Sequence, residues 1–134
     1  MNYENLVDAR KVQEYVANMR PNFNKRAVFS DETENYRTPV EPQPGDTVSI
    51  RIRTKKNNVD FVYLICGEEK KQMNLIESKD GFDYYGITIR IGTETVHYYF
   101  EIISGRIHCF YNKSGVTREV DEHYSFGIVP GFQT

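Results

Sequence analysis

The chain has 134 residues, with 17 basic against 19 acidic side chains and a formal net charge of −2. This length suffices for one domain with its own core, and so nearly balanced a charge produces no field that would concentrate nucleic acid or an anionic membrane. The sequence holds no apolar run near the roughly 20 residues that a membrane-spanning helix needs, and no signal peptide at its start, so we expect a cytoplasmic protein without nucleic-acid or membrane partners.

Residues 5–19 have the spacing of an amphipathic helix. Apolar residues at intervals of three and four fall on one face of this segment: Leu6, Ala9, Val12, Val16 and Met19. Asn5 can cap the start of the helix, and Pro21 lies just beyond its end. The apolar face either docks on the rest of the domain or forms a surface for a partner. We therefore treat 1–23 as a helical extension ahead of a domain at 24–134.

From Lys25 onward the pattern changes to the two-residue period of β-strands, and the ten Tyr and eight Phe also favour strands. A short strand is expected at 27–29, a polar turn at 30–35 and a proline-rich edge segment at 38–45. Further strands are expected at 46–54, 59–66, 70–76, 82–91, 95–103 and 106–112, with a last short one within 124–132. The turns between them contain Asn57-Asn58, Asp80-Gly81 and Ser104-Gly105. This regular spacing predicts an all-β fold, an immunoglobulin-like antiparallel β-sandwich of about seven or eight strands.

Alternation along these strands assigns side chains to a core face and a solvent face. The residues expected to face the core are Val48, Ile50, Ile52, Val62, Leu64, Cys66, Tyr85, Ile87, Ile89, Val96, Tyr98, Phe100 and Ile102. Five aromatic rings are expected to face solvent: Phe61, Tyr63, Tyr84, Tyr99 and Phe110. So many outward rings indicate a binding surface, unless the proline-rich segment or the N-terminal helix covers some of them. Tyr84 and Tyr99 lie on consecutive strands joined near Gly92–Glu94, which predicts that they are cross-strand neighbours forming a shallow platform.

The sequence contains no recognisable catalytic or metal-binding constellation. Three histidines lie on or near strands without ligand spacing, so we expect them to be solvated: His97, His108 and His123. Glu119, Asp121 and Glu122 share a loop, whereas a glycosidase needs two carboxylates at a defined separation across a cleft. We predict no catalytic residue, no metal, no cofactor and no enzyme activity for this chain alone. Cys66 and Cys109 are expected to be buried thiols, the alternative being one disulfide between the sheets.

Four segments occur in an order and spacing that resemble a known family: 27–39, 48–64, 82–89 and 96–102, followed by Pro-Gly-Phe at 130–132. Over about 24–132 the chain is similar to the N-terminal immunoglobulin-like domain of neopullulanase- and cyclomaltodextrinase-type enzymes of the α-amylase family. That domain is a starch-associated carbohydrate-binding module. In the family, the Pro-Gly-Phe motif leads into the catalytic (β/α)8 barrel, so the resemblance implies a barrel after Thr134 that carries the catalytic acids.

The resemblance implies a non-catalytic domain that binds or positions a starch-like α-glucan, such as a maltooligosaccharide, pullulan or cyclodextrin. The five outward rings would then stack on sugar rings, with Tyr84 and Tyr99 contributing most. Family members often carry Trp on this sheet, including at the position of Tyr85, and its absence here predicts weak binding because Trp offers the largest stacking face. The alternative is structural: in related cyclomaltodextrin-degrading enzymes this domain helps build a homodimer and walls the partner's active site. The expected partners are therefore α-glucan, the protein's own catalytic domain and a second copy.

Overall fold

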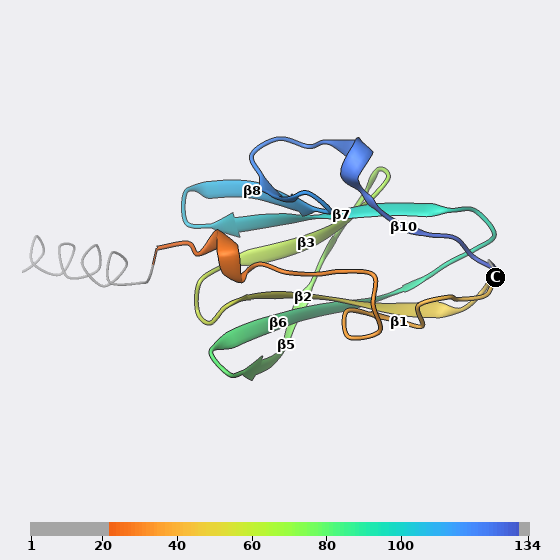
Figure 1. The fold of residues 1–134 in the computed structure, drawn as a ribbon, viewed down its shortest axis with the longest axis horizontal. Coiled ribbons are helices and arrows are strands. Elements are labelled where there is room, and N and C mark those ends of the chain that lie inside the picture. Colours follow the sequence, from red (N-terminus) through yellow and green to blue (C-terminus); the bar gives the residue numbers. More distant parts are fainter. Residues whose placement is uncertain (1–21, 132–134) are drawn as a thin grey trace, which may run out of the picture.

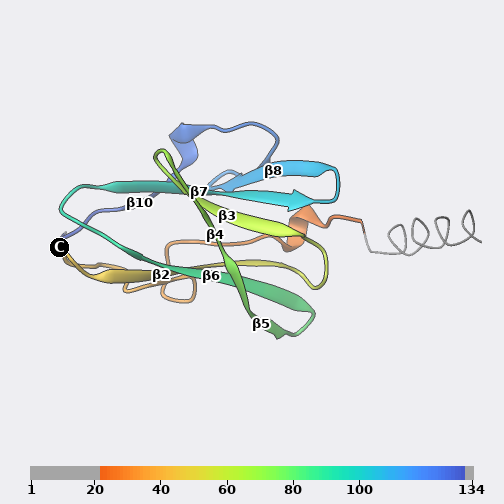
Figure 2. The same ribbon diagram turned by 180° about the vertical axis from the view of Figure 1, so that it is seen from behind.

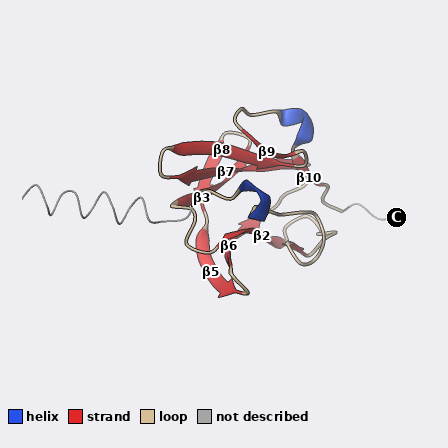
Figure 3. Ribbon diagram, turned by 60° about the vertical axis from the view of Figure 1, so that its left-hand side comes forward, coloured by secondary structure: helices blue, strands red, loops and turns tan. Residues whose placement is uncertain are grey.

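The chain folds into two antiparallel sheets that pack face to face (Figure 1 and Figure 3). The computed structural model describes residues 22–131, in which ten strands and two short 3₁₀ helices form the whole of the regular structure. The predicted immunoglobulin-like β-sandwich is confirmed, with more strands than expected because several are only two to four residues long. The helix predicted at 5–19 lies outside the described residues.

Sheet A has the strand order β1-β2-β6-β5. Its strands are β1 (Arg37–Thr38), β2 (Thr47–Lys55), β5 (Asn74–Lys79) and β6 (Phe82–Arg90). Sheet B has the order β4-β3-β7-β8-β9, and β10 also pairs with β7. Its strands are β3 (Phe61–Cys66), β4 (Glu69–Gln72), β7 (Val96–Ser104), β8 (Ile107–Asn112), β9 (Gly115–Thr117) and β10 (Phe126–Ile128). The 3₁₀ helices are η1 (Lys25–Ala27) and η2 (Glu122–Tyr124).

The core lies between the two sheets and is formed by the side chains that the alternation predicts. The predicted residues that are fully buried are Val48, Ile50, Ile52, Val62, Leu64, Tyr98, Phe100 and Ile102. Because a one-residue slip would expose a whole set, their burial confirms the predicted register of β2, β3 and β7. Cys66 and Cys109 are free thiols, as predicted, but only Cys109 is buried in this core; Cys66 is partly buried and packs against it. Two residues at positions that the alternation assigns to the solvent face, Ile65 and Glu101, are instead buried on the outer face of sheet B.

Two expected strands differ in the structure. Residues 27–29 do not form a strand, because the side chain of Asn24 accepts a hydrogen bond from the Arg26 amide and starts helix η1; only a single bridge between Phe29 and Arg53 remains. The expected strand at 70–76 is two strands, β4 in sheet B and β5 in sheet A. Between them Met73 is buried in the core, so the chain crosses from one layer to the other at this residue (Figure 2).

The strands β6 and β7 do not form the hairpin that the sequence predicts. β6 lies in sheet A and β7 in sheet B, and the connection between them crosses the end of the sandwich. Buried Ile91 explains the crossing, because its amide donates to Asp46 O at 3.0 Å and its carbonyl accepts from the Gly45 amide at 2.9 Å. These bonds hold the chain at the end of sheet A, and the next strand then pairs with β3 in the other layer.

A buried arginine connects the two sheets at their edge. Arg37 of β1 is only 7% exposed, and its Nη1 donates to the carbonyl of Gly127 in β10 at 2.7 Å and to Glu32 Oε2 at 3.1 Å. The same Glu32 oxygen accepts from the Gly127 amide at 3.1 Å, and its other oxygen lies 3.0 Å from Lys113 Nζ. We call Glu32 and Arg37 the edge latch. It ties the 30–40 segment to β10 and so fixes the start of β7, where the candidate site lies.

Candidate functional site

Four of the five rings predicted to face solvent share the outer face of sheet B. Phe61 and Tyr63 come from β3, Tyr99 from β7 and Phe110 from β8. Tyr84 comes from β6 and lies on the outer face of sheet A. The prediction that Tyr84 and Tyr99 are cross-strand neighbours is therefore wrong, because the chain changes sheets between them.

The four rings on sheet B form two pairs. Phe61 and Tyr63 are stacked, with centroids 6.2 Å apart and planes 25° apart. Tyr99 and Phe110 meet edge to face, with centroids 6.0 Å apart. Phe61 is 45% exposed, and the other three are partly exposed. The outer face of sheet B therefore offers aromatic surface to a ligand without burying any of the four rings completely.

A carboxylate lies between the two ring pairs. Register places Glu101 of β7 opposite Tyr63 on one side and Phe110 on the other. The side chain of Glu101 is only 10% exposed, and its Oε1 accepts from Lys70 Nζ at 2.7 Å and lies 3.3 Å from His108 Nε2. The hydrogen bond to Glu101 raises the pKa of Lys70, so the ammonium stays charged. These contacts explain why Glu101 is buried although its position faces outward.

Tyr99 also borders a hollow of about 320 Å³. Its other lining residues are Gly67, His97, Glu122 and Ser125. Gly67 belongs to the β3–β4 turn and has a φ of 57°, whereas Glu122 begins η2, whose first turn is capped by the side chain of Asp121. Burial raises the pKa of the Tyr99 phenol, and the nearby carboxylates of Glu122 and Glu101 raise it further, so the hydroxyl remains a proton donor at neutral pH.

Sequence reasoning missed the polar part of this site. The sequence pattern places Glu122 only as one of three acids that share a loop, and the site residues predicted from the sequence do not include Glu101. For Glu101 one signal was present: it is the single acidic residue in the aromatic strand Val96–Ser104, at an outward position between Tyr99 and Ile103. For Glu122 and His97 no signal was available, because the approach of η2 to the start of β7 depends on β10 pairing with β7.

Tyr84 lies in a different environment on sheet A. The guanidinium carbon of Arg51 lies 4.8 Å from the centroid of the Tyr84 ring, and Arg51 Nη2 donates to Glu77 Oε2 at 2.8 Å. Tyr84 and Tyr36 border a separate hollow of about 290 Å³. The two rings that the sequence placed together therefore each border a hollow of their own, on opposite faces of the sandwich.

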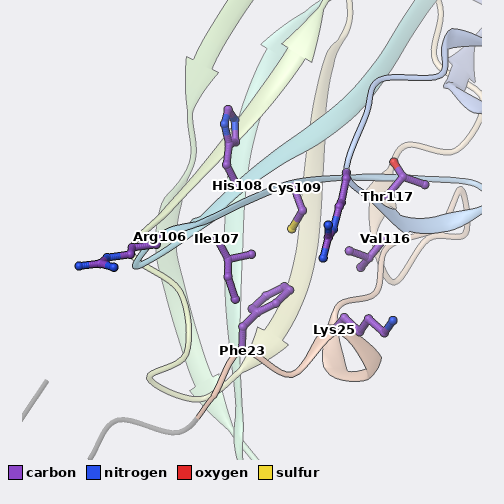
Figure 4. A pocket seen from close by; sticks show the side chains of 9 residues that line it. Phe23, Lys25, Arg106, Ile107, His108, Cys109, Val116 and Thr117 are labelled. Atoms are coloured by element: carbon purple, nitrogen blue, oxygen red, sulfur yellow. The ribbon is translucent and has the colours of Figure 1, made fainter. Parts of the chain in front are cut away.

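A larger hollow, of about 450 Å³, lies at the end of the sandwich near Phe23 (Figure 4). Phe23 and Ile107 face each other across it, and the charged ends of Arg106 and Lys25 point to opposite sides. Its lining contains no carboxylate and no carboxamide. It therefore lacks the carboxylate that lines each of the other two hollows, and none of the five candidate rings borders it.

Among residues 22–131 no group of three or more His, Cys, Asp and Glu side chains is placed to hold a metal ion. The described part of the chain also contains no helix long and apolar enough to cross a membrane.

Comparison with known proteins gives the family. The chain matches the family described as "Alpha amylase, N-terminal ig-like domain" over residues 23–129. A search of curated proteins found no match.

Three similar solved structures share the fold. A cyclomaltodextrinase superposes with a TM-score of 0.66 at 23% identity, covering 78% of this chain and 19% of that one. A maltogenic amylase from S. marinus has a TM-score of 0.62 at 14% identity, covering 79% of this chain and 15% of that one. The type III pullulan hydrolase from Thermococcus kodakarensis has a TM-score of 0.52 at 18% identity, covering 79% of this chain and 17% of that one. The chain thus spans less than a fifth of the length of each, and, as the family match over most of its residues shows, it belongs to the N-terminal immunoglobulin-like domains of the α-amylases.

Proposed function

We propose that this chain is the non-catalytic domain of an α-glucan-degrading hydrolase and that it binds α-glucan on the outer face of sheet B. The observation that carries the proposal is the position of Tyr99, which lies beside Phe110 and borders a hollow with Glu122, His97 and Ser125. The similar structures are named as a cyclomaltodextrinase, a maltogenic amylase and a pullulan hydrolase, and these names all denote enzymes that act on α-glucans.

The chemistry of this face suits a neutral sugar. The apolar face of a glucose unit can stack on an aromatic ring, and its hydroxyls need both donors and acceptors. Glu122 supplies an acceptor, Ser125 supplies both kinds of group, and the protonated phenol of Tyr99 supplies a donor. Because the hollow is shallow and the chain has no Trp, we expect a dissociation constant around millimolar, or about −4 kcal/mol.

Affinity electrophoresis in gels containing soluble starch tests this proposal. The wild-type chain should be retarded, and Tyr99→Ala and Glu122→Ala should each migrate as in a gel without starch. Tyr124→Ala is the matched control, since Tyr124 is an exposed ring on η2 that does not border the hollow. A wild-type chain without retardation, or a Tyr99→Ala variant retarded as much as wild type, would contradict binding at this face.

A structural function is the second candidate, and the edge strand β5 favours it. β5 is the last strand of sheet A, every residue in it is exposed, and its Leu75 and Ile76 are 54% and 53% exposed. Unpaired edge strands with apolar side chains are suited to contact with another protein surface. Here the partner would be the enzyme's own catalytic domain or a second copy. Sedimentation of the full-length enzyme with Ile76→Lys tests this: an unchanged dimer would exclude β5 from the interface between copies.

A further inference from the structure

We propose that the domain carries a second saccharide site, centred on Tyr84 on the outer face of sheet A, so that one domain holds two α-glucan chains on opposite faces. This inference rests on the proposed function, because it assigns the same class of ligand to a second hollow. It starts from the finding that Tyr84 and Tyr99, which the sequence placed side by side, lie on different sheets.

The second hollow also combines tyrosine rings with hydrogen-bonding side chains, and unlike the first it is lined by two cations, Arg51 and Lys79. It has a volume of about 290 Å³ and combines two tyrosine rings, Tyr84 and Tyr36, with hydrogen-bonding side chains of Asn35, Glu77 and Asp80. The carboxamide of Asn35 supplies both a donor and an acceptor, and the carboxylates supply acceptors. Burial raises the pKa of the Tyr36 phenol, which therefore stays protonated and can donate to a sugar oxygen.

The side chains around this hollow are held in place before a ligand arrives. Arg51 is fixed by its contact with the Tyr84 ring at 4.8 Å and by its 2.8 Å hydrogen bond to Glu77. Tyr36 is fixed against Phe29, with ring centroids 5.1 Å apart and planes 72° apart. Ordered side chains lose little further conformational freedom when a ligand binds, so even a shallow site of this kind can hold a sugar.

The two hollows cannot serve one short stretch of glucan. Tyr84 faces outward from sheet A and Tyr99 outward from sheet B, and the packed core lies between the sheets. Two ligands on opposite faces bind independently when they are short oligosaccharides. On a surface that presents many chains, such as a starch granule, both sites can be engaged and the apparent affinity rises by avidity.

A titration of the ¹⁵N-labelled chain with maltoheptaose, followed by amide NMR shifts, tests the inference. We expect two sets of shifted amides, one at Asn35, Tyr36 and Asp80 and one at Gly67, Glu122 and Ser125. Tyr84→Ala should abolish the first set and leave the second unchanged, and Tyr99→Ala should do the reverse. Retention on granular starch should fall more than tenfold in either variant, whereas Tyr124→Ala should be retained like wild type.

The outcomes separate this inference from the proposed function. Shifts confined to the set around Glu122 would overturn the second site and leave the proposed function intact. Shifts in neither set would contradict both. If the amide spectrum shows that Tyr84→Ala is unfolded, Asn35→Ala replaces it, because Asn35 is an exposed loop residue whose loss should weaken only the sheet A set.

Discussion

Replacing Arg37 by Met should destabilise the domain by removing the cation of the edge latch. The guanidinium makes two well-formed hydrogen bonds, to Gly127 O at 2.7 Å and to Glu32 Oε2 at 3.1 Å, and longer contacts to Val40 O at 3.3 Å and the Tyr98 hydroxyl at 3.4 Å. Met preserves most of the aliphatic stem but supplies no donor, so each of these acceptors loses the bond from Arg37, although Glu32 Oε2 keeps its bond from the Gly127 amide.

The magnitude follows from the burial of each group. Removing one member of a buried ion pair typically costs about 3–5 kcal/mol. The cost here lies toward the lower end, because Glu32 is 33% exposed and keeps its contact with Lys113. The Nε of Arg37 is also buried without a hydrogen-bond partner among residues 22–131. The Met variant no longer buries this group, and the stability that it gains in this way offsets part of the loss. We expect a loss of about 3 kcal/mol and a fall in Tm of roughly 10–15 °C for a domain of this size.

Urea unfolding followed by far-UV circular dichroism measures this loss. Arg90→Met is the matched control, because Arg90 is an exposed arginine of β6, in the same sheet, and should stay within about 0.5 kcal/mol of wild type. If the free energy of unfolding of Arg37→Met equals that of the control, the bonds of Arg37 in the edge latch make no net contribution to the stability of the domain. If it is more stable than wild type, the cost of burying the guanidinium exceeds the value of its bonds.

Three further predictions concern other parts of the fold. Burial raises the pKa of Glu32, but hydrogen bonds and its cationic neighbours outweigh this and lower the pKa below its usual 4.5. The contribution of ionised Glu32 to stability is therefore present above pH 4.5 and is lost as the pH falls through the lowered pKa. The difference in free energy of unfolding between wild type and Glu32→Gln should shrink in acid urea titrations, and a difference that grew would contradict the pairing. Burial raises the pKa of the Cys66 and Cys109 thiols to about 11 each. Neither thiol should therefore react quickly with a disulfide reagent at pH 8 in the folded protein. Fast labelling of both thiols without denaturant would contradict this prediction. A Cβ added at Gly86 would lie 2.7 Å from Ile76 Cδ1, which is the far end of an exposed side chain that can turn away. Gly86→Ala should therefore change the free energy of urea unfolding by less than about 0.5 kcal/mol, and a loss of about 2 kcal/mol or more would show that Ile76 cannot move.

Much of the sandwich could be predicted from local sequence patterns. Successive side chains of a strand point to opposite faces, so the alternation of Val48, Ile50 and Ile52 with polar residues identifies the buried face whatever the partner strand is. The turns could also be predicted from the residues at the turn itself. Asp80 and Gly81 both have positive φ, as the tight hairpin between β5 and β6 requires. The same alternation identified the rings that point outward, which is why the candidate site was partly visible in the sequence.

The sequence by itself determined the long strands, their buried sides and the set of outward rings, because these depend on neighbours along the chain. Only the tertiary structure decided which rings share a face. Two crossings between the layers, at Met73 and after Ile91, place β5 and β6 in one sheet and β4 and β7 in the other. A crossing depends on hydrogen bonds and core contacts with residues far away in the sequence, and it leaves the local alternation unchanged. For that reason Tyr84 and Tyr99 looked like neighbours in the sequence, although the core separates them in the fold.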